Sequence, residues 1–531
     1  MAPSGKSRGF LHQGVSYLDY KQIDMDRVLT AFLARLRNNG WPSRLARTSE
    51  LSPDTIVDTF LEHPELFEGF DRDVTRRWVE THLVDMVSRG KPTQAMAGLR
   101  PLHGYTYRFR NARRSRPYGA DEQLYELIRH APQGRGERVL GYLREFFFTG
   151  IDRRTEQRRL TDEIDVETHA LINLYVAVKG LITDQADKDK ARASHPPLCP
   201  EASDLIAEDV VRLLAHRAHI PRSAMVDYLK ILFAFHLALY HLRIIKELPK
   251  LVEGRTERWS HGIFLDATGD PRSAPARLAE RSAQVWFARI PEFLKATYTV
   301  AKLDEFAQHL VGRYKLREPK GGFFKVRELL PLLGPRYRAD RTAFGNARLA
   351  SVLGSSHPSD ERLDSEISQI LQLGLDEFTT YVEVATALRV GFHHKYLTDC
   401  LDSLLLKNRP GAMIAQPHRG KRRFVLDSRL LEVLLQISLV RQGESGVYQT
   451  APLRVDEFLE VLRKRYGLYL DRLPEGDGFA GASILDQAVL RANRAAFVAR
   501  LREIGYYSEL SDAYLTQTIT PRYVITPDRT A

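Results

Sequence analysis

The stretch that most constrains the fold is YLKILFAFHLALYHLRII, at residues 228–245. It is close to the roughly 20 apolar residues that a membrane-spanning helix requires. Four polar residues interrupt it: Lys230, His236, His241 and Arg243. Polar groups at such depths in a bilayer are costly. We therefore expect no membrane association and a buried core helix around which the other elements pack.

Most of the remaining chain also has helical spacing. Apolar residues fall at helical spacing in residues 28–36, and residues 71–90 form another amphipathic pattern that ends at Gly90. Outside the C-terminal region the best strand candidate is residues 105–110, where aromatic and polar residues alternate. The sequence predicts a mainly α protein with few short strands.

The length of 531 residues exceeds what one ordinary core organises, so several domains are expected. Polar stretches rich in proline, glycine or serine mark candidate linkers, and no period of 20–50 residues recurs. The predicted division is a disordered lead at 1–14, an N-terminal helical domain at 15–90, an Arg-rich helical region with a short strand segment at 91–200, a central helical domain at 201–407 and a winged-helix-like domain at 408–531.

The C-terminal region has the most informative order of elements. Helical spacing at 426–441 precedes an extended piece at 448–455, two further helices at 456–470 and 485–505, and two extended pieces around a polar turn. This is the order of a winged helix, a module that binds DNA or docks proteins. In its DNA-binding form the third helix enters the major groove, while Leu490, Phe497, Leu501 and Ile504 would face the core.

Basic residues are unevenly distributed. The net charge is +11, and residues 100–159 contain 14 basic against 7 acidic residues, an excess that attracts phosphate. The predicted nucleic-acid contacts form three groups: Arg108, Arg110, Arg113, Arg114 and Arg116 beside aromatic residues; Arg422, Arg423, Arg463, Lys464 and Arg465 for phosphates; and Arg491, Asn493, Arg494, Arg500 and Arg502 on the third helix. Asn493 is the candidate for a base edge.

A protein-docking alternative stays open. Residues 409–531 contain 18 basic and 14 acidic residues, a modest excess for a DNA reader. The insertion at 471–483, between the second and third helices, is also long for a compact DNA-binding module. A helical protein–protein scaffold without DNA contact would have the same pattern.

Signs of catalysis are few. The two cysteines, Cys199 and Cys400, cannot form a disulfide framework and fit a reducing cytoplasm. There is no G-x-S-x-G nucleophile motif, and no histidine cluster has a recognised zinc spacing. We expect no catalytic residue, cofactor, metal or small-molecule substrate. A divergent enzyme with a site in the His393–Asp402 region is the second alternative.

Two terminal segments carry a resemblance. RGFLHQGVSYLDYKQIDMDRVLTAFLARL (8–36) and FVARLREIGYYSELSDAYLTQTITPRYVI (497–525) resemble a component of bacterial methylation-associated anti-phage defence systems. Such systems combine a DNA methyltransferase with kinase, nuclease and accessory subunits. The resemblance implies an accessory or DNA-engaging subunit and assigns no site residues. The predicted protein is a non-enzymatic, cytoplasmic subunit whose partners are double-stranded DNA and other subunits.

Overall fold

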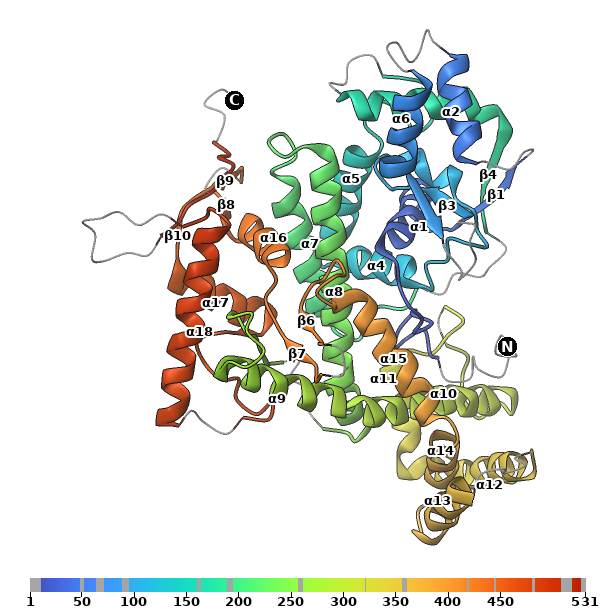
Figure 1. The fold of residues 1–531 in the computed structure, drawn as a ribbon. Coiled ribbons are helices and arrows are strands. Elements are labelled where there is room, and N and C mark those ends of the chain that lie inside the picture. The colour runs from blue at the N-terminus through green and yellow to red at the C-terminus, as the bar shows by residue number, and fades with distance from the viewer. Residues whose placement is uncertain are drawn as a thin grey trace.

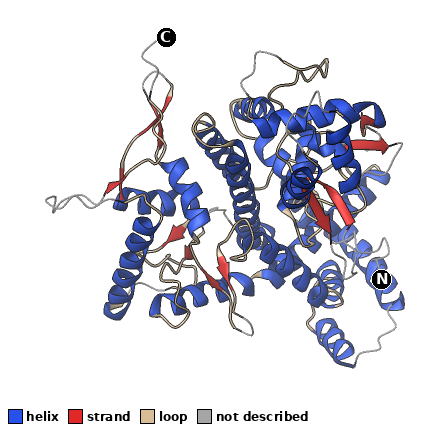
Figure 2. Ribbon diagram, turned by 45° about the horizontal axis from the view of Figure 1, so that its top comes forward, coloured by secondary structure: helices blue, strands red, loops and turns tan. Residues whose placement is uncertain are grey.

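The structure, a computed structural model, is mainly helical, with 59% helix and 9% strand, as predicted. Figure 2 shows the short strands set among the helices. The described residues are 11–47, 52–63, 71–87, 95–159, 164–188, 194–255, 261–319, 321–355, 361–417, 420–443, 446–479, 483–507 and 518–526. Residues 1–10 of the predicted disordered lead lie outside this part, whereas His12 is already buried.

The N-terminal part comprises helices and two strand pairs (Figure 1). Its elements are α1 (Met25–Arg37), β1 (Ser43–Arg47), α2 (Pro53–Glu62), α3 (Arg72–Trp78), the π-helical turn η2 (Val79–Leu83), β2 (Val84–Val87), β3 (Ala95–Leu99), the 3₁₀ helix η3 (Gly104–Phe109), α4 (Ala120–Arg129), α5 (Arg135–Phe147), α6 (Val166–Val178), η4 (Lys179–Leu181) and β4 (Ile182–Ala186). β1 pairs antiparallel with β4, and β2 with β3. The predicted single helix at 71–90 is wrong, because the chain becomes extended at Val84 to pair with β3.

The central part is helical apart from one short strand. Its elements are α7 (Pro200–Leu214), α8 (Arg222–Val252), β5 (Ile263–Phe264), α9 (Ala274–Ala288), α10 (Ile290–Gly312), α11 (Val326–Leu329), the 3₁₀ helices η5 (Leu330–Leu333) and η6 (Pro335–Tyr337), α12 (Arg338–Ser355), α13 (Glu361–Gln372), α14 (Glu377–Ala387) and α15 (Val390–Leu405). Helices α10 and α15 pack against α8, while α12, α13 and α14 form a lobe at the lower right of Figure 1.

Helix α8 confirms the predicted core helix. Among the described residues it alone is long and apolar enough to cross a membrane, and 94% of its apolar window is buried inside the protein. Its polar side chains have partners: Lys230 Nζ lies 2.7 Å from Asp26 Oδ1, His236 Nε2 lies 3.0 Å from Asp209 Oδ2, and His241 Nε2 lies 2.9 Å from Ser16 Oγ. Without these contacts the polar groups would be buried in the core with no hydrogen-bond partner.

The C-terminal part contains three main helices and several short strands. Its elements are β6 (Ile414–Ala415), β7 (Arg423–Phe424), α16 (Ser428–Ser438), β8 (Val440–Gln442), β9 (Tyr448–Thr450), β10 (Leu453–Arg454), α17 (Val455–Tyr466), β11 (Leu468–Tyr469), α18 (Ile484–Glu503) and β12 (Thr518–Ile519). β8 and β9 form an antiparallel hairpin, and β10 pairs antiparallel with β12. The polar turn of the predicted wing falls at 508–517, outside the described residues. The winged-helix assignment therefore stays a prediction.

The C-terminal part is tied closely to the central helices. β11 pairs parallel with β5, and the buried carboxylate of Asp477 binds Lys246 Nζ at 2.9 Å and Arg289 at 2.8 Å. Phe479 packs against Phe264 in a small apolar cluster. The 471–483 insertion thus includes a segment that docks on α8 and α9, which accounts for its length. A single cluster of buried side chains extends from Val15 to Ile519.

A candidate nucleic-acid interface

The inner face of α18 packs as predicted, but its asparagine does not. Leu490, Phe497 and Leu501 are buried. Asn493 is buried too: its Oδ1 accepts the Ala267 N–H at 2.8 Å, and its Nδ2 donates to the carbonyls of Leu265 and Leu470 at 2.9 and 2.8 Å. The prediction that Asn493 is available to a base edge is wrong, because its amide fastens the 265–267 loop to α18.

The arginines of α18 differ from one another. Arg494 lies 2.8 Å from the Asp456 carboxylate, and Arg500 donates to the carbonyl of Leu426. Arg491 and Arg502 are exposed. The outer face of α18 therefore presents two arginines to solvent, and their role in binding stays a prediction.

The aromatic–arginine segment is not the exposed strand that its alternation predicts. All six residues of η3 are buried, and the Tyr105 ring stacks on Tyr175 with centroids 4.2 Å apart. Arg108 donates to Glu156 and to the Tyr175 hydroxyl, both at 2.6 Å, and to Asp184 at 3.3 Å. The rings of Tyr105, Tyr107 and Phe109 belong to the core with Arg108, so none of these three rings offers a stacking surface to nucleic acid.

The segment becomes more open only beyond Arg110. Burial lowers the pKa of Arg110. Arg113, Arg114 and Arg116 line a pocket of about 390 Å³ together with Tyr118. Their predicted contact with nucleic acid remains a prediction.

The predicted phosphate ligands near the C-terminal module are mostly paired with carboxylates. Arg422 lies 3.1 Å from Asp402, and the buried Arg423 lies 3.3 Å from Asp266. The remaining pairs are Arg463 with Asp471 at 2.6 Å, Lys464 with Glu460 at 2.9 Å, and Arg465 with Glu208 at 2.8 Å and Asp209 at 2.5 Å. Internal carboxylates therefore offset much of this charge.

The His393–Asp402 region does not assemble a metal centre within the described residues, where no three ligating side chains converge. His393 is buried against the Tyr298 ring, and its burial lowers its pKa to about 4. Cys400 is buried, and the Asp402 carboxylate accepts a hydrogen bond from Arg422. The contacts of these side chains are those of packing residues.

Positive charge outnumbers negative charge elsewhere, in two pockets that α5 lines. Tyr142 lines one pocket and the neighbouring Gly141 lines the other. Together the pockets are lined by eight arginines and only three carboxylates, and we call them the basic groove. The arginines are Arg135, Arg138, Arg144, Arg153, Arg159, Arg212, Arg217 and Arg222, and the carboxylates are Glu145, Asp165 and Glu208.

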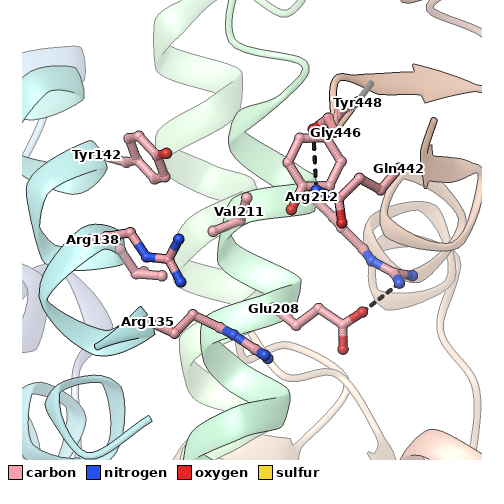
Figure 3. A pocket seen from close by; sticks show the side chains of 10 residues that line it. Arg135, Arg138, Tyr142, Glu208, Val211, Arg212, Gln442, Gly446 and Tyr448 are labelled. Atoms are coloured by element: carbon pink, nitrogen blue, oxygen red, sulfur yellow. Dashed lines mark hydrogen bonds and ion pairs between the residues drawn. The ribbon is translucent and has the colours of Figure 1, made fainter. Parts of the chain in front are cut away.

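The first pocket, of about 450 Å³, lies between α5, α7 and the β8–β9 hairpin. Figure 3 shows Arg138 and Tyr142 on the α5 wall and Tyr448 on the opposite wall, with α7 between them. Glu208 pairs with Arg212 on the same helix and with Arg465 from α17. Arg138 is exposed and forms no ion pair with the described residues.

The second pocket, of about 720 Å³, continues toward the turn between α7 and α8. Burial, followed by repulsion from Arg144, lowers the pKa of Arg153, and burial lowers the pKa of Arg222 to about 10. The buried Nε of Arg153 has no hydrogen-bond partner among the described residues. Arg217 is exposed and, in the same part of the chain, forms no ion pair. The guanidinium groups of Arg153 and Arg217, which form no ion pair with the described residues, favour an anionic ligand here.

The sequence predicted a basic region at 100–159 but did not predict the basic groove. The arginines of α5 lie within the basic cluster at 100–159, and Arg138, Tyr142 and Glu145 have the spacing of one helix face. That spacing is the signal that could have identified the α5 wall. No pattern in the sequence near Arg217 or Tyr448 indicated that these residues would line the same groove.

Comparison with known families identifies the chain's relatives. The family model for methylation-associated defense system protein MAD7 matches residues 5–523, which is nearly the whole chain, so the protein belongs to this family. No curated protein matches the chain. The resemblance seen in the two terminal segments is confirmed as membership in a methylation-associated defence family.

Proposed function

We propose that this member of the MAD7 family binds nucleic acid through the basic groove and acts as a DNA-engaging subunit of its defence system. The observation that carries the proposal is the set of groove arginines, Arg138, Arg153 and Arg217, that form no ion pair with the described residues. An arginine without a carboxylate partner can offer its full charge and its donors to phosphate.

The chemistry of the groove suits a phosphate backbone better than a base sequence. Guanidinium groups line both pockets, whereas the one side chain predicted to read a base, Asn493, is buried. Contacts to phosphate position a protein on DNA and carry no sequence information directly. We therefore expect the groove to bind duplexes of different sequence with similar affinity.

The test is duplex affinity as a function of salt. Each phosphate contact adds about 0.9 to the slope of log affinity against log salt, because binding releases counterions. The double variant Arg138→Ala/Arg217→Ala should bind a labelled duplex more weakly and with a slope shallower by about 2. The comparison variant is Arg491→Ala/Arg502→Ala, which removes the same charge from the exposed face of α18. The proposal predicts unchanged affinity for it, whereas a comparable loss would place the DNA contact on α18 instead. Absent or salt-insensitive duplex binding by the unaltered chain would contradict the proposal.

Protein docking by the C-terminal module is a second candidate. The observation that favours it is the pairing of Arg423, Arg463 and Arg465 with internal carboxylates, which leaves that region with little charge for DNA. A docking role predicts that other subunits of the system still copurify with the Arg138→Ala/Arg217→Ala variant. Loss of those subunits together with DNA binding would argue against a separate docking surface.

A further inference from the structure

The first pocket of the basic groove contains two tyrosines on facing walls. Tyr142 projects from α5 and is 43% exposed, and the half-buried Tyr448 projects from β9 on the other side (Figure 3). Within the described residues neither ring stacks on another ring, and neither hydroxyl forms a hydrogen bond. The core tyrosines contrast with them, since Tyr105 stacks on Tyr175.

The surroundings of these rings define a ligand that is partly flat and partly anionic. Arg138 lines the same pocket and forms no ion pair with the described residues, so a purely apolar ligand would leave its charge without a partner. Arg135 and Arg212 add positive charge beside it, each paired with a carboxylate of α7. The volume of about 450 Å³ falls within the usual range for small-molecule sites. A nucleotide unit combines a face for stacking on tyrosine with a phosphate for arginine.

The bases of a duplex cannot use this pocket, because their faces are covered by neighbouring base pairs. Single strands and flipped nucleotides expose those faces, and proteins bind them with aromatic platforms beside cationic tracks. We infer that the Tyr142–Tyr448 pocket receives an unstacked base of a single-stranded DNA segment whose backbone follows the basic groove. The inference rests on the proposed function and adds the form of nucleic acid that the groove prefers.

The experiment compares single-stranded and duplex DNA on the full chain. The probe is a short oligonucleotide with a central 2-aminopurine, whose fluorescence is quenched when it stacks, used alone and annealed to its complement. The unaltered chain should bind the single strand with quenching and more tightly than the duplex. Tyr142→Ala/Tyr448→Ala should weaken single-strand binding by about 5- to 100-fold and abolish the quenching. Duplex binding should change less than twofold.

Two controls identify stacking as the cause. Tyr142→Phe/Tyr448→Phe retains the rings and should retain both affinity and quenching. Tyr314→Ala removes a tyrosine that is 98% exposed and lies outside both pockets, and it should have no effect. Equal single-strand affinity in the alanine variant, or equal losses in the alanine and phenylalanine variants, would overturn the inference. If duplex binding still depends on Arg138 and Arg217, the proposed function survives that result; if no DNA binds at all, both fail.

Discussion

Two arginine-rich regions of this protein, the segment around η3 and the basic groove, have opposite physical characters. Arg108 in the first is buried among Glu156, Asp184 and the Tyr175 hydroxyl. Arg138 in the second is exposed and forms no ion pair with the described residues. The density of arginine along the sequence is high in both. Burial and the position of the carboxylates distinguish an arginine that holds the fold together from one that can bind a ligand.

The first test of this comparison removes Arg108. Arg108→Ala would leave the buried Asp184 carboxylate without its ion-pair partner, whereas Glu156 would keep Arg37 at 3.3 Å. Breaking one side of a buried ion pair costs about 3–5 kcal/mol in the free energy of unfolding. Denaturant titration should show this loss, and Arg138→Ala should stay within about 0.5 kcal/mol of the unaltered chain. Similar losses of unfolding free energy in the two variants would show that Arg108 and Arg138 do not differ in their contribution to stability.

The second test lowers the pH, which should destabilise the protein interior and leave the charge of the basic groove unchanged. Burial lowers the pKa of His12 and His241 to about 4, from an ordinary value of 6.5. Between pH 6.5 and 4 these histidines bind protons in the unfolded chain but not in the folded protein. Their contribution to the free energy of unfolding is therefore complete above pH 6.5 and is lost as the pH falls toward 4. Between about pH 7.5 and 5 each should lower the free energy of unfolding by roughly 2 kcal/mol.

The control for the acid test is the groove itself, because its arginines keep their charge over this interval. We expect duplex affinity to hold until the protein begins to unfold, and His241→Gln to reduce the pH dependence of unfolding. An equal free energy of unfolding at both pH values would show that the folded protein does not lower the pKa of these histidines.

A third test concerns the amide that fastens α18. Asn493→Ala would leave the Ala267 N–H and the carbonyls of Leu265 and Leu470 without their partner. An unsatisfied buried polar group costs about 1–3 kcal/mol. Thermal unfolding measures that loss, and the exposed neighbour change Arg491→Ala should be nearly neutral. A variant that keeps full stability but alters which DNA sequence is bound would restore the base-reading role.

The smallest effect on stability should come from Arg153. Its neighbours repel its charge, and its Nε has no partner within the described residues, so Arg153→Leu should change the free energy of unfolding by less than about 0.5 kcal/mol. Duplex affinity should nevertheless fall, with a salt slope shallower by about 1. A marked loss of stability would place Arg153 with Arg108, among the arginines that support the fold.

Prediction from sequence succeeded where local pattern decides the outcome. The apolar stretch at 228–245 could only be buried, and the spacing of Leu490, Phe497 and Leu501 identified the inner face of α18. It failed where distant residues decide. Alternating residues at 105–110 were read as a strand, but a stacked Tyr175 and distant carboxylates enclose them as a 3₁₀ helix.

The candidate site was unpredictable for the same reason. Asn493 was assigned to DNA because nothing nearby in sequence showed that the 265–267 loop would take its amide. The α5 wall could have been recognised from helical spacing, but Tyr448 reaches the same pocket from more than 300 residues further along the chain. Only the packing of α5, α7 and the β8–β9 hairpin brings those walls together.

The position of α7 between the two walls has a consequence for the entropy of binding. Asp204 on α7 pairs with Arg135 of α5, and Glu208 on α7 pairs with Arg465 of α17. The α5 wall is therefore held to α7 before any ligand arrives, and α7 is held in turn to α17. A preorganised groove loses little conformational freedom on binding, so more of its contact energy is available as affinity.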